Sequence, residues 1–180
     1  RATIGGMGLT GHILEVAVRL ERIPSAWVWR ESERVDDLDS LVAQLRTDSR
    51  SWPFTMSWVD SLRAGPGMGR GIVMRGRWAT SEEAPALPPK ARVTLAVPFD
   101  LPAWVLARPS VRLFNFAYFH THGRSVRRGV VHPQAFFYPL DAIRRWNRLY
   151  GKRGFTQYQC VMPVDNGAAH RDICLIPSSA

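Results

Sequence analysis

Residues 136–162 read FFYPLDAIRRWNRLYGKRGFTQYQCVM. This order predicts a strand, a tight turn, a short helix and a second strand. Asp141 is placed to cap the helix, and Gly151 stands where a left-handed residue ends a helix. The apolar residues between them recur at helical spacing. We therefore expect one face of the helix to carry Ile143, Trp146 and Tyr150.

The second strand is expected to begin near Phe155. Alternation places two amides, Gln157 and Gln159, on the same face as Phe155 and Val161. Such a pair either faces solvent or lines a pocket. A buried amide needs a hydrogen-bond partner, which the hydroxyl groups of a sugar can provide. The apolar neighbours favour a partly buried site.

The composition is that of a globular protein with one sizeable core in 180 residues. The formal net charge of +9 is carried almost entirely by arginine. It permits nucleic acid, anionic lipid or phosphorylated ligands as partners, although a solvated basic surface explains it more simply. No apolar run reaches the roughly 18 residues of a membrane-spanning helix. Cys160 and Cys174 do not form a metal-binding spacing.

Residues 5–11 read GGMGLTG, in which Gly6, Gly8 and Gly11 satisfy the dinucleotide-binding pattern G-x-G-x-x-G. That pattern indicates a Rossmann fold only when a helix follows it. Here apolar residues alternate from Leu14 to Leu20, which predicts a strand ending before Pro24. We therefore expect a loop that needs glycine for positive φ or for close approach to a ligand.

The remaining patterns predict an α+β fold with a mainly antiparallel sheet and covering helices. Strands are expected at residues 54–62, 71–78 and 93–97. Helices are expected at 36–47 and at 102–119, the latter interrupted at Pro109. A glycine-rich turn at 64–70, an exposed excursion at 80–92 and a basic loop at 120–130 connect them.

Two further patterns could carry other chemistry. His120 and His122 could offer two metal ligands, but a third is missing and the neighbouring Arg124 and Arg127 oppose a cation, so no metal is predicted. The basic and aromatic residues at 144–153 could form a nucleic-acid platform. The tryptophan among them lies on the predicted apolar face of the helix, which favours a core role instead.

Several short motifs occur together in one known group of enzymes. They are residues 2–11 (ATIGGMGLTG), Trp58, 69–71 (GRG), 75–76 (RG), 137–141 (FYPLD), 146–148 (WNR), 150–151 (YG), 154–155 (GF) and 157–159 (QYQ). In this order they resemble FAD-dependent oxidoreductases of the vanillyl-alcohol oxidase/p-cresol methylhydroxylase (PCMH) type. The most similar branch is that of decaprenylphosphoryl-β-D-ribose oxidase and the sugar-lactone (arabinono-lactone and gulono-lactone) oxidases. The resemblance extends from residue 2 to about residue 167.

The resemblance implies two domains. Residues 1–24 would be the C-terminal end of the FAD-binding PCMH-type domain, and residues 25–180 a substrate (cap) domain that is incomplete at its C-terminus. The complete protein would bind FAD, against Gly6, Gly8, Gly11 and Ile13. The residues implied to bind substrate are Trp58, Phe137, Trp146, Gln157 and Gln159.

The implied reaction is oxidation of an alcohol group on a sugar, sugar-lactone or polyol by hydride transfer to flavin. The resemblance assigns no catalytic residue in this chain and leaves the electron acceptor open. Residues 1–180 alone are expected to be inactive and not to hold FAD tightly. Met7 and the pair Phe137-Tyr138 stand where the ribose-oxidase branch has asparagine and Tyr-His. These departures argue against a prenyl-phosphate substrate, although a lipid-linked sugar stays open.

The alternative function is a non-enzymatic basic module that binds nucleic acid or an anionic surface. It requires arginines and exposed aromatic residues to share one face. Under the oxidoreductase hypothesis no nucleic-acid partner is expected. The predicted location is then the cytoplasm, with association at the inner face of the membrane left open.

Overall fold

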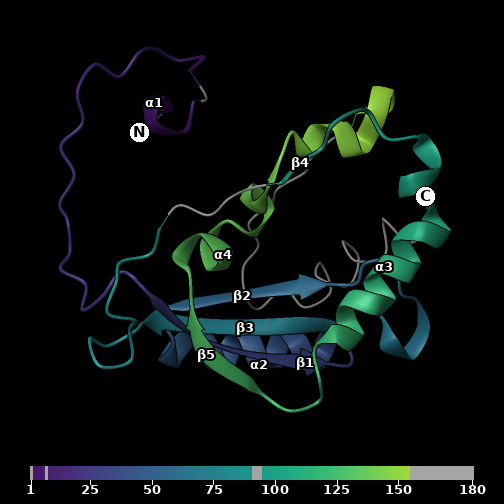
Figure 1. Ribbon diagram of the computed structural model, residues 1–180, viewed down its shortest axis with the longest axis horizontal. Coiled ribbons are helices and arrows are strands. Elements are labelled where there is room, and N and C mark those ends of the chain that lie inside the picture. Colours follow the sequence, from purple (N-terminus) through teal and green to yellow (C-terminus); the bar gives the residue numbers. More distant parts are fainter. Residues whose placement is uncertain (1, 7, 91–94, 155–180) are drawn as a thin grey trace.

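The computed structural model describes residues 2–6, 8–90 and 95–154. Its centre is an antiparallel sheet with the strand order β2-β3-β1-β5 (Figure 1). The strands are β1 (Val28–Val35), β2 (Phe54–Val59), β3 (Gly71–Trp78) and β5 (Arg127–Val131). A short parallel pair joins β4 (Leu95–Ala96) to β6 (Ile143–Arg144). The predicted α+β class with a mainly antiparallel sheet is confirmed.

One face of the sheet is covered by α2 (Leu38–Ser51), which lies behind the strands in Figure 1. The helix begins where predicted because the side chain of Asp37 accepts a hydrogen bond from the backbone N–H of Ser40, at 2.8 Å. Leu38 and Leu41 are buried against the strands. The apolar spacing thus correctly indicated this helix. The helix ends at Ser51, four residues beyond the predicted end at residue 47.

The opposite face receives α4 (Pro133–Phe137) and α3 (Arg108–Thr121). Phe136 of α4 is 2% exposed and packs over the middle of the sheet. In Figure 1, α3 crosses one end of the strands. It follows a 3₁₀ helix, η2 (Ala103–Leu106), and Pro109 lies in its first turn, where no backbone N–H is needed. The predicted helical region is therefore interrupted, but at Ala107, two residues before Pro109.

Gly76 of β3 is required by the close approach of Phe136. A Cβ atom at Gly76 would lie 2.6 Å from Cζ of Phe136 and 3.2 Å from Cγ1 of Val28. Replacing Gly76 by alanine is therefore expected to lower the free energy of unfolding by about 1–3 kcal/mol, the usual cost of overpacking a core. Urea denaturation followed by circular dichroism measures this change.

Gly129 provides the matched control, because Gly76 and Gly129 are the two cross-strand neighbours of Arg30. No atom lies within 4 Å of a Cβ built at Gly129. Alanine there is expected to leave the stability unchanged or to raise it by about 0.5 kcal/mol, because alanine loses less backbone entropy on folding. Equal losses at both positions would contradict the packing argument.

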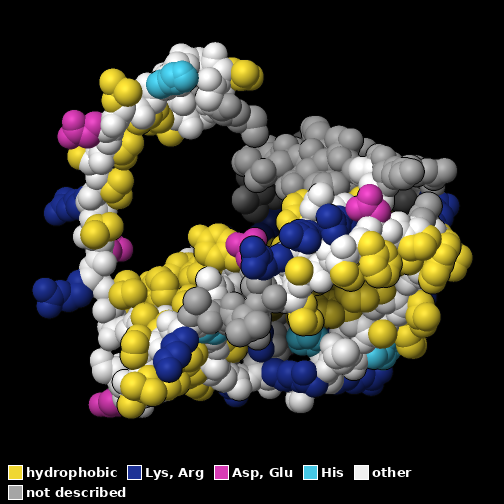
Figure 2. Space-filling model, turned by 45° about the horizontal axis from the view of Figure 1, so that its top comes forward, with side chains coloured by type: hydrophobic (Ala, Val, Ile, Leu, Met, Phe, Trp, Pro, Cys, Tyr) yellow, Lys and Arg dark blue, Asp and Glu magenta, His cyan; other side chains and the backbone are white. Residues whose placement is uncertain are grey.

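The strand predicted from the alternation of Leu14 to Leu20, ending before Pro24, is not formed. This segment has no regular secondary structure and leads away from the sheet as an extended arm (Figure 1). Leu14 and Leu20 are 97% and 87% exposed, and Figure 2 shows hydrophobic side chains exposed along the arm. A strand needs a hydrogen-bonded neighbour. Among the described residues none pairs with this segment, so its alternating pattern has no sheet to join.

The predicted strand–turn–helix order at residues 136–151 is also wrong. Phe136 and Phe137 end α4, and the chain continues through η3 (Pro139–Ala142), β6 and η4 (Trp146–Arg153). Two tertiary constraints override the helical spacing. The backbone N–H of Val97 donates to the carbonyl of Arg144 at 3.0 Å, and Arg145 is left-handed with φ of 56°. The second strand, from Phe155, lies outside the described residues.

Gly151 has a positive φ of 55°, but its ψ of −152° is not that of the predicted left-handed C-cap. It lies inside η4 rather than at the end of an α-helix. A Cβ at Gly151 would also lie 2.7 Å from the carbonyl oxygen of Leu101. Glycine is therefore needed here both for its conformation and for the close contact.

The predicted basic loop at 120–130 contains a strand, because β5 begins at Arg127 and pairs with β1 at the edge of the sheet. Its charged side chains fit an edge strand, where charge opposes further pairing. The glycine-rich turn at 64–70 holds a short 3₁₀ helix, η1 (Gly65–Gly67), and residues 80–90 form a largely exposed excursion. The chain opens with α1 (Ala2–Gly5). Within the described residues, no helix has the length and apolar character needed to cross a membrane.

Candidate functional site

The four residues implied to contact a cofactor lie on the N-terminal arm. Gly8 and Gly11 have φ of 81° and 143°, so the expectation of positive φ in this loop is met at both positions. No atom lies within 4 Å of a Cβ built at Gly8. Gly6 is half-buried and Ile13 is 53% exposed. The backbone of this loop is therefore accessible to a ligand at Gly8.

Two of the implied substrate residues, Trp58 and Phe137, share one face of the sheet. Trp58 lies on β2 opposite Ile72, and its ring packs edge-on against Tyr118 of α3 at 4.9 Å. The ring of Phe137 lies 5.0 Å from that of Phe54. Together with Trp78 they form a half-buried surface, which we call the aromatic face: Phe54, Trp58, Trp78, Tyr118 and Phe137.

Three members of the aromatic face were not identified as candidates from the sequence. Phe54 lies on the same side of β2 as Trp58, since the two residues are an even number of positions apart. Trp78 contacts both Phe54 and Phe137, at 5.5 and 5.7 Å. The alternation of the strand could have indicated Phe54. Tyr118 is brought to Trp58 only by the docking of α3.

Trp146, the third implied substrate residue that the structure describes, is not brought to this face. Trp146 lies in η4, which packs against η2, and its ring is 6.1 Å from that of Tyr150. Trp146 is half-buried rather than part of an apolar helix stripe. Gln157 and Gln159 lie outside the described residues. Of the three implied residues within the described part of the chain, two lie together on the aromatic face.

A buried carboxylate fixes α3 over the end of the sheet. Asp60, 3% exposed, follows β2 and accepts a hydrogen bond from Nδ2 of Asn115 at 2.7 Å. Nε and Nη2 of Arg70 donate to its other oxygen at 3.0 and 2.8 Å. Charge-assisted, two-pronged pairing of this kind is among the stronger hydrogen-bond arrangements. Since Asn115 precedes Tyr118 by one helical turn, the contact also positions the aromatic face.

The two histidines considered as metal ligands are engaged in local contacts. Nδ1 of His120 lies 2.7 Å from the carbonyl oxygen of Phe116. Burial, together with the nearby cations Arg127 and Arg34, lowers the pKa of His122, although a backbone hydrogen bond at Tyr118 acts in the opposite direction. Among the described residues, no group of three potential ligands from His, Cys, Asp and Glu gathers.

Much of the positive charge near the sheet is neutralised locally. Arg75 contacts three carboxylates, and Arg77 pairs with Glu83 at 2.7 Å. Arg128, in the basic cluster of the sequence, pairs with Glu31 at 2.9 Å. A nucleic-acid platform needs cations available to phosphate. This part of the surface offers few of them, so the basic-module alternative is not favoured.

Comparison with known proteins relates this chain to an oxidase. The chain is 28% identical over 171 residues to the decaprenylphosphoryl-beta-D-ribose oxidase of Mycolicibacterium smegmatis, an alignment that covers 91% of this chain and 37% of the relative. It is also 35% identical over 105 residues to an uncharacterized protein from the mprA 5′ region of Streptomyces coelicolor, covering 56% of this chain and 29% of that protein. No protein-family model matches the chain.

The match to the oxidase is consistent with the resemblance that the motifs indicated: the chain is a distant homologue of that oxidase. The match extends over nearly the whole chain, so it does not rest on the glycine loop alone. The chain spans less than two fifths of the length of either relative. An oxidoreductase class is therefore supported by homology.

Proposed function

We propose that this chain is part of an FAD-dependent oxidoreductase that oxidises an alcohol group of a sugar, sugar-lactone or polyol. The observation that carries the proposal is the similarity to an oxidase over 91% of the chain. In the reaction the alcohol loses a hydride from carbon and a proton from oxygen, and becomes a carbonyl group. FAD, when bound, supplies the hydride acceptor.

The contribution of this chain is to bind and orient the substrate. The aromatic face offers flat, partly exposed rings at Trp58 and Phe137, which suit the apolar face of a sugar ring and exclude water from it. Gln157 and Gln159 would donate and accept hydrogen bonds at substrate hydroxyls. Residues 25–180 act as the substrate domain in this proposal, and residues 1–24 as the end of the FAD-binding domain.

The residues proposed to contact FAD fit that role in one observable respect. Positive φ at Gly8 and Gly11, with open space where a Cβ of Gly8 would stand, leaves the backbone accessible to a flat ligand. Ile13 offers exposed apolar surface next to this loop. A substitution that adds a side chain at Gly8 would both strain the backbone and block this approach.

The proposal predicts that the complete protein containing this chain purifies with bound flavin. Under anaerobic conditions, a member of a panel of sugar lactones, alditols and lipid-linked sugars is expected to bleach the visible flavin absorbance. Gln157→Ala should slow the bleaching by that substrate and leave the flavin spectrum unchanged, because the amide is proposed to hold the substrate rather than the cofactor.

Two results would contradict these assignments. A complete protein that contains no flavin, and does not take it up when reconstituted, would exclude the oxidoreductase function. Loss of flavin from the Gln157→Ala variant would place this residue at the cofactor instead of the substrate. Residues 1–180 expressed alone are expected to retain flavin poorly, and stoichiometric flavin in that preparation would contradict the proposed division between the domains.

A further inference from the structure

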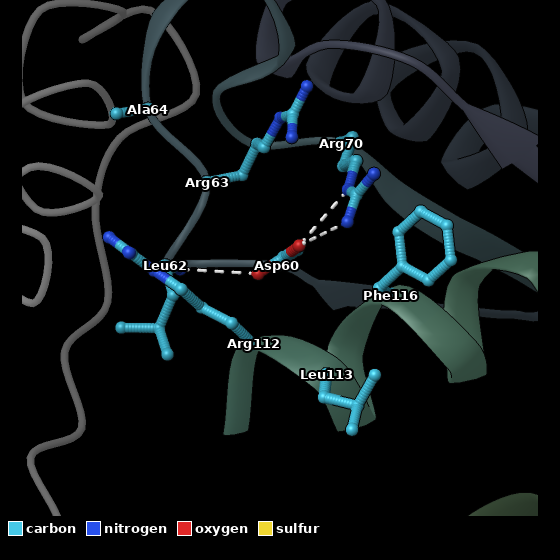
Figure 3. A pocket seen from close by; sticks show the side chains of 8 residues that line it. All are labelled: Asp60, Leu62, Arg63, Ala64, Arg70, Arg112, Leu113 and Phe116. Atoms are coloured by element: carbon cyan, nitrogen blue, oxygen red, sulfur yellow. Dashed lines mark hydrogen bonds and ion pairs between the residues drawn. The ribbon is translucent and has the colours of Figure 1, made fainter. Parts of the chain in front are cut away.

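A cavity of about 400 Å³ lies between the segment after β2 and the middle of α3 (Figure 3). Asp60 and Arg63 line it from the segment after β2, and Arg70 from the residue before β3. Arg112, Leu113 and Phe116 line it from α3. Its volume is within the range of small-molecule sites. The proposed oxidation uses none of these side chains.

The charge of the cavity is positive, because its lining contains three arginines and one carboxylate. Asp60 is already occupied, since Arg70 binds one of its oxygens and Asn115 the other. Figure 3 shows Arg70 turned toward Asp60, whereas the side chains of Arg63 and Arg112 extend away from it. Arg63 and Arg112 thus supply the uncompensated charge of the cavity.

Exposed apolar side chains line the cavity on its α3 side. Leu113 and Phe116 are 69% and 52% exposed and lie one turn apart on α3. Arg112 directly precedes Leu113 on the same helix. Arg63 packs beside Gly67, where a Cβ would lie 3.3 Å from its Nε. The cavity therefore combines two cations with an apolar wall.

We propose that this cavity binds a phosphate monoester whose organic group is apolar. Arginine presents donors in a fork that matches the oxygens of phosphate, and two arginines balance the two negative charges of a monoester. The organic group would lie against Leu113 and Phe116. This site goes beyond the proposed oxidation, because its ligand is recognised by charge rather than by hydroxyl groups.

Phenyl phosphate is a suitable probe, with binding to the purified protein measured by titration calorimetry near physiological ionic strength. Saturable binding is expected. Arg63→Gln and Arg112→Gln should each weaken it about tenfold, the usual effect of losing a charge-assisted hydrogen bond. Arg50→Gln is the matched control, because Arg50 lies in the last turn of α2, far from the cavity, and should bind as the parent protein does. Circular dichroism verifies that each variant is folded.

The choice of ligand tests the apolar wall. Phenyl phosphate should bind several times more tightly than inorganic phosphate, and phenol should not bind. Phe116→Ala should remove most of the advantage of phenyl phosphate and leave the affinity for inorganic phosphate unchanged. Undiminished binding in the Arg63→Gln/Arg112→Gln double variant would overturn the proposal. So would an equal loss in Arg50→Gln, which would indicate a general charge effect, or an undiminished preference for phenyl phosphate in Phe116→Ala.

Discussion

Replacing Phe119 by alanine is expected to lower the free energy of unfolding by about 3–5 kcal/mol, the usual cost of truncating a buried phenylalanine. Phe119 is 2% exposed and is the buried apolar residue of α3. The guanidinium groups of Arg34 and Arg70 lie 4.0 and 4.5 Å from its ring centroid. Removing the ring leaves a cavity and withdraws both cation–π contacts. Urea denaturation measures the loss.

Phe114→Ala is the matched control, because Phe114 lies on the same helix and is 62% exposed. Its replacement is expected to change the stability by less than about 1 kcal/mol, as is usual for surface positions. Hydrogen exchange gives a second measurement. In Phe119→Ala the amides of α3 should exchange faster, while those of α2, on the other face of the sheet, remain protected. Equal effects of the two substitutions would contradict the anchoring role of Phe119.

The anchoring of α3 matters for both proposed sites. The helix supplies Tyr118 to the aromatic face and Arg112 to the cavity. Asp60 and Phe119 hold it by different means, one through hydrogen bonds and the other through burial. A variant with undocked α3 should therefore lose phenyl phosphate binding together with the contact between Trp58 and Tyr118. Because both sites depend on the docking of α3, the cavity is tested with substitutions that leave the helix docked. Arg63 and Arg112 are exposed and do not hold the helix.

Elements with one apolar face could be predicted from the sequence. The predicted strand at 71–78 has the same bounds as β3, and the predicted helix at 36–47 corresponds to α2. In both, apolar residues recur with the period of the element, and a turn or cap marks the start. Ile72 and Leu41 are buried as this pattern requires. Local sequence and tertiary packing favour the same structure in these segments.

The strands β1 and β5 do not show this pattern. β1 lies in the interior of the sheet, yet it carries Arg30, Glu31 and Glu33. The glutamates are tolerated because arginines on neighbouring strands compensate them: Glu31 lies opposite both Arg75 and Arg128. The stabilising partners are distant in sequence. A hydrophobicity pattern therefore cannot reveal these strands.

The candidate site was predictable only in part. The motifs pointed to Trp58 and Phe137, and the sheet brings both to one face. The contact between Phe137 and Phe54 depends on α4, whose helical start at Pro133 follows a cap by His132. In the arm at residues 12–23 the sequence pattern instead predicted a strand that does not form. Alternation leads to a strand only where a neighbouring strand is available to pair with it. The Phe137–Phe54 contact and the conformation of the arm therefore both depend on tertiary partners.

Arg75→Met is expected to lower the free energy of unfolding by about 3 kcal/mol at neutral pH, because it removes one side of a largely buried ionic network. Nη1 of Arg75 donates to Glu33 at 2.9 Å and to Asp48 at 3.0 Å, and Nε donates to Glu31 at 3.2 Å. The side chains of Arg75 and Asp48 are 12% and 6% exposed. Methionine fills a similar volume, so the cost arises from carboxylates that lose their cation. Urea denaturation at pH 7 measures it.

The pH dependence distinguishes this explanation from a simple loss of packing. In the parent protein, burial raises the pKa of Glu31, but hydrogen bonds from Arg128 and Arg75 outweigh burial and hold the pKa below its usual value of 4.5. Its contribution to stability is therefore present above pH 4.5 and is lost as the pH falls through the lowered pKa. In Arg75→Met the clustered carboxylates should instead have raised pKa values in the folded state, so protonation stabilises that state as the pH falls.

The stabilities of the two proteins should consequently converge between pH 7 and pH 4. A packing defect would keep them apart by the same amount over this range. Arg77→Met is the matched control, because Arg77 lies on the same strand and face but forms a more accessible pair with Glu83, whose pKa is lowered to about 2 by the Arg77 side chain and the Thr80 backbone N–H. Its replacement should cost much less than that of Arg75, since a more accessible pair is better screened by solvent. A difference between Arg75→Met and the parent protein that does not change with pH would show that the carboxylates are not the source of the instability.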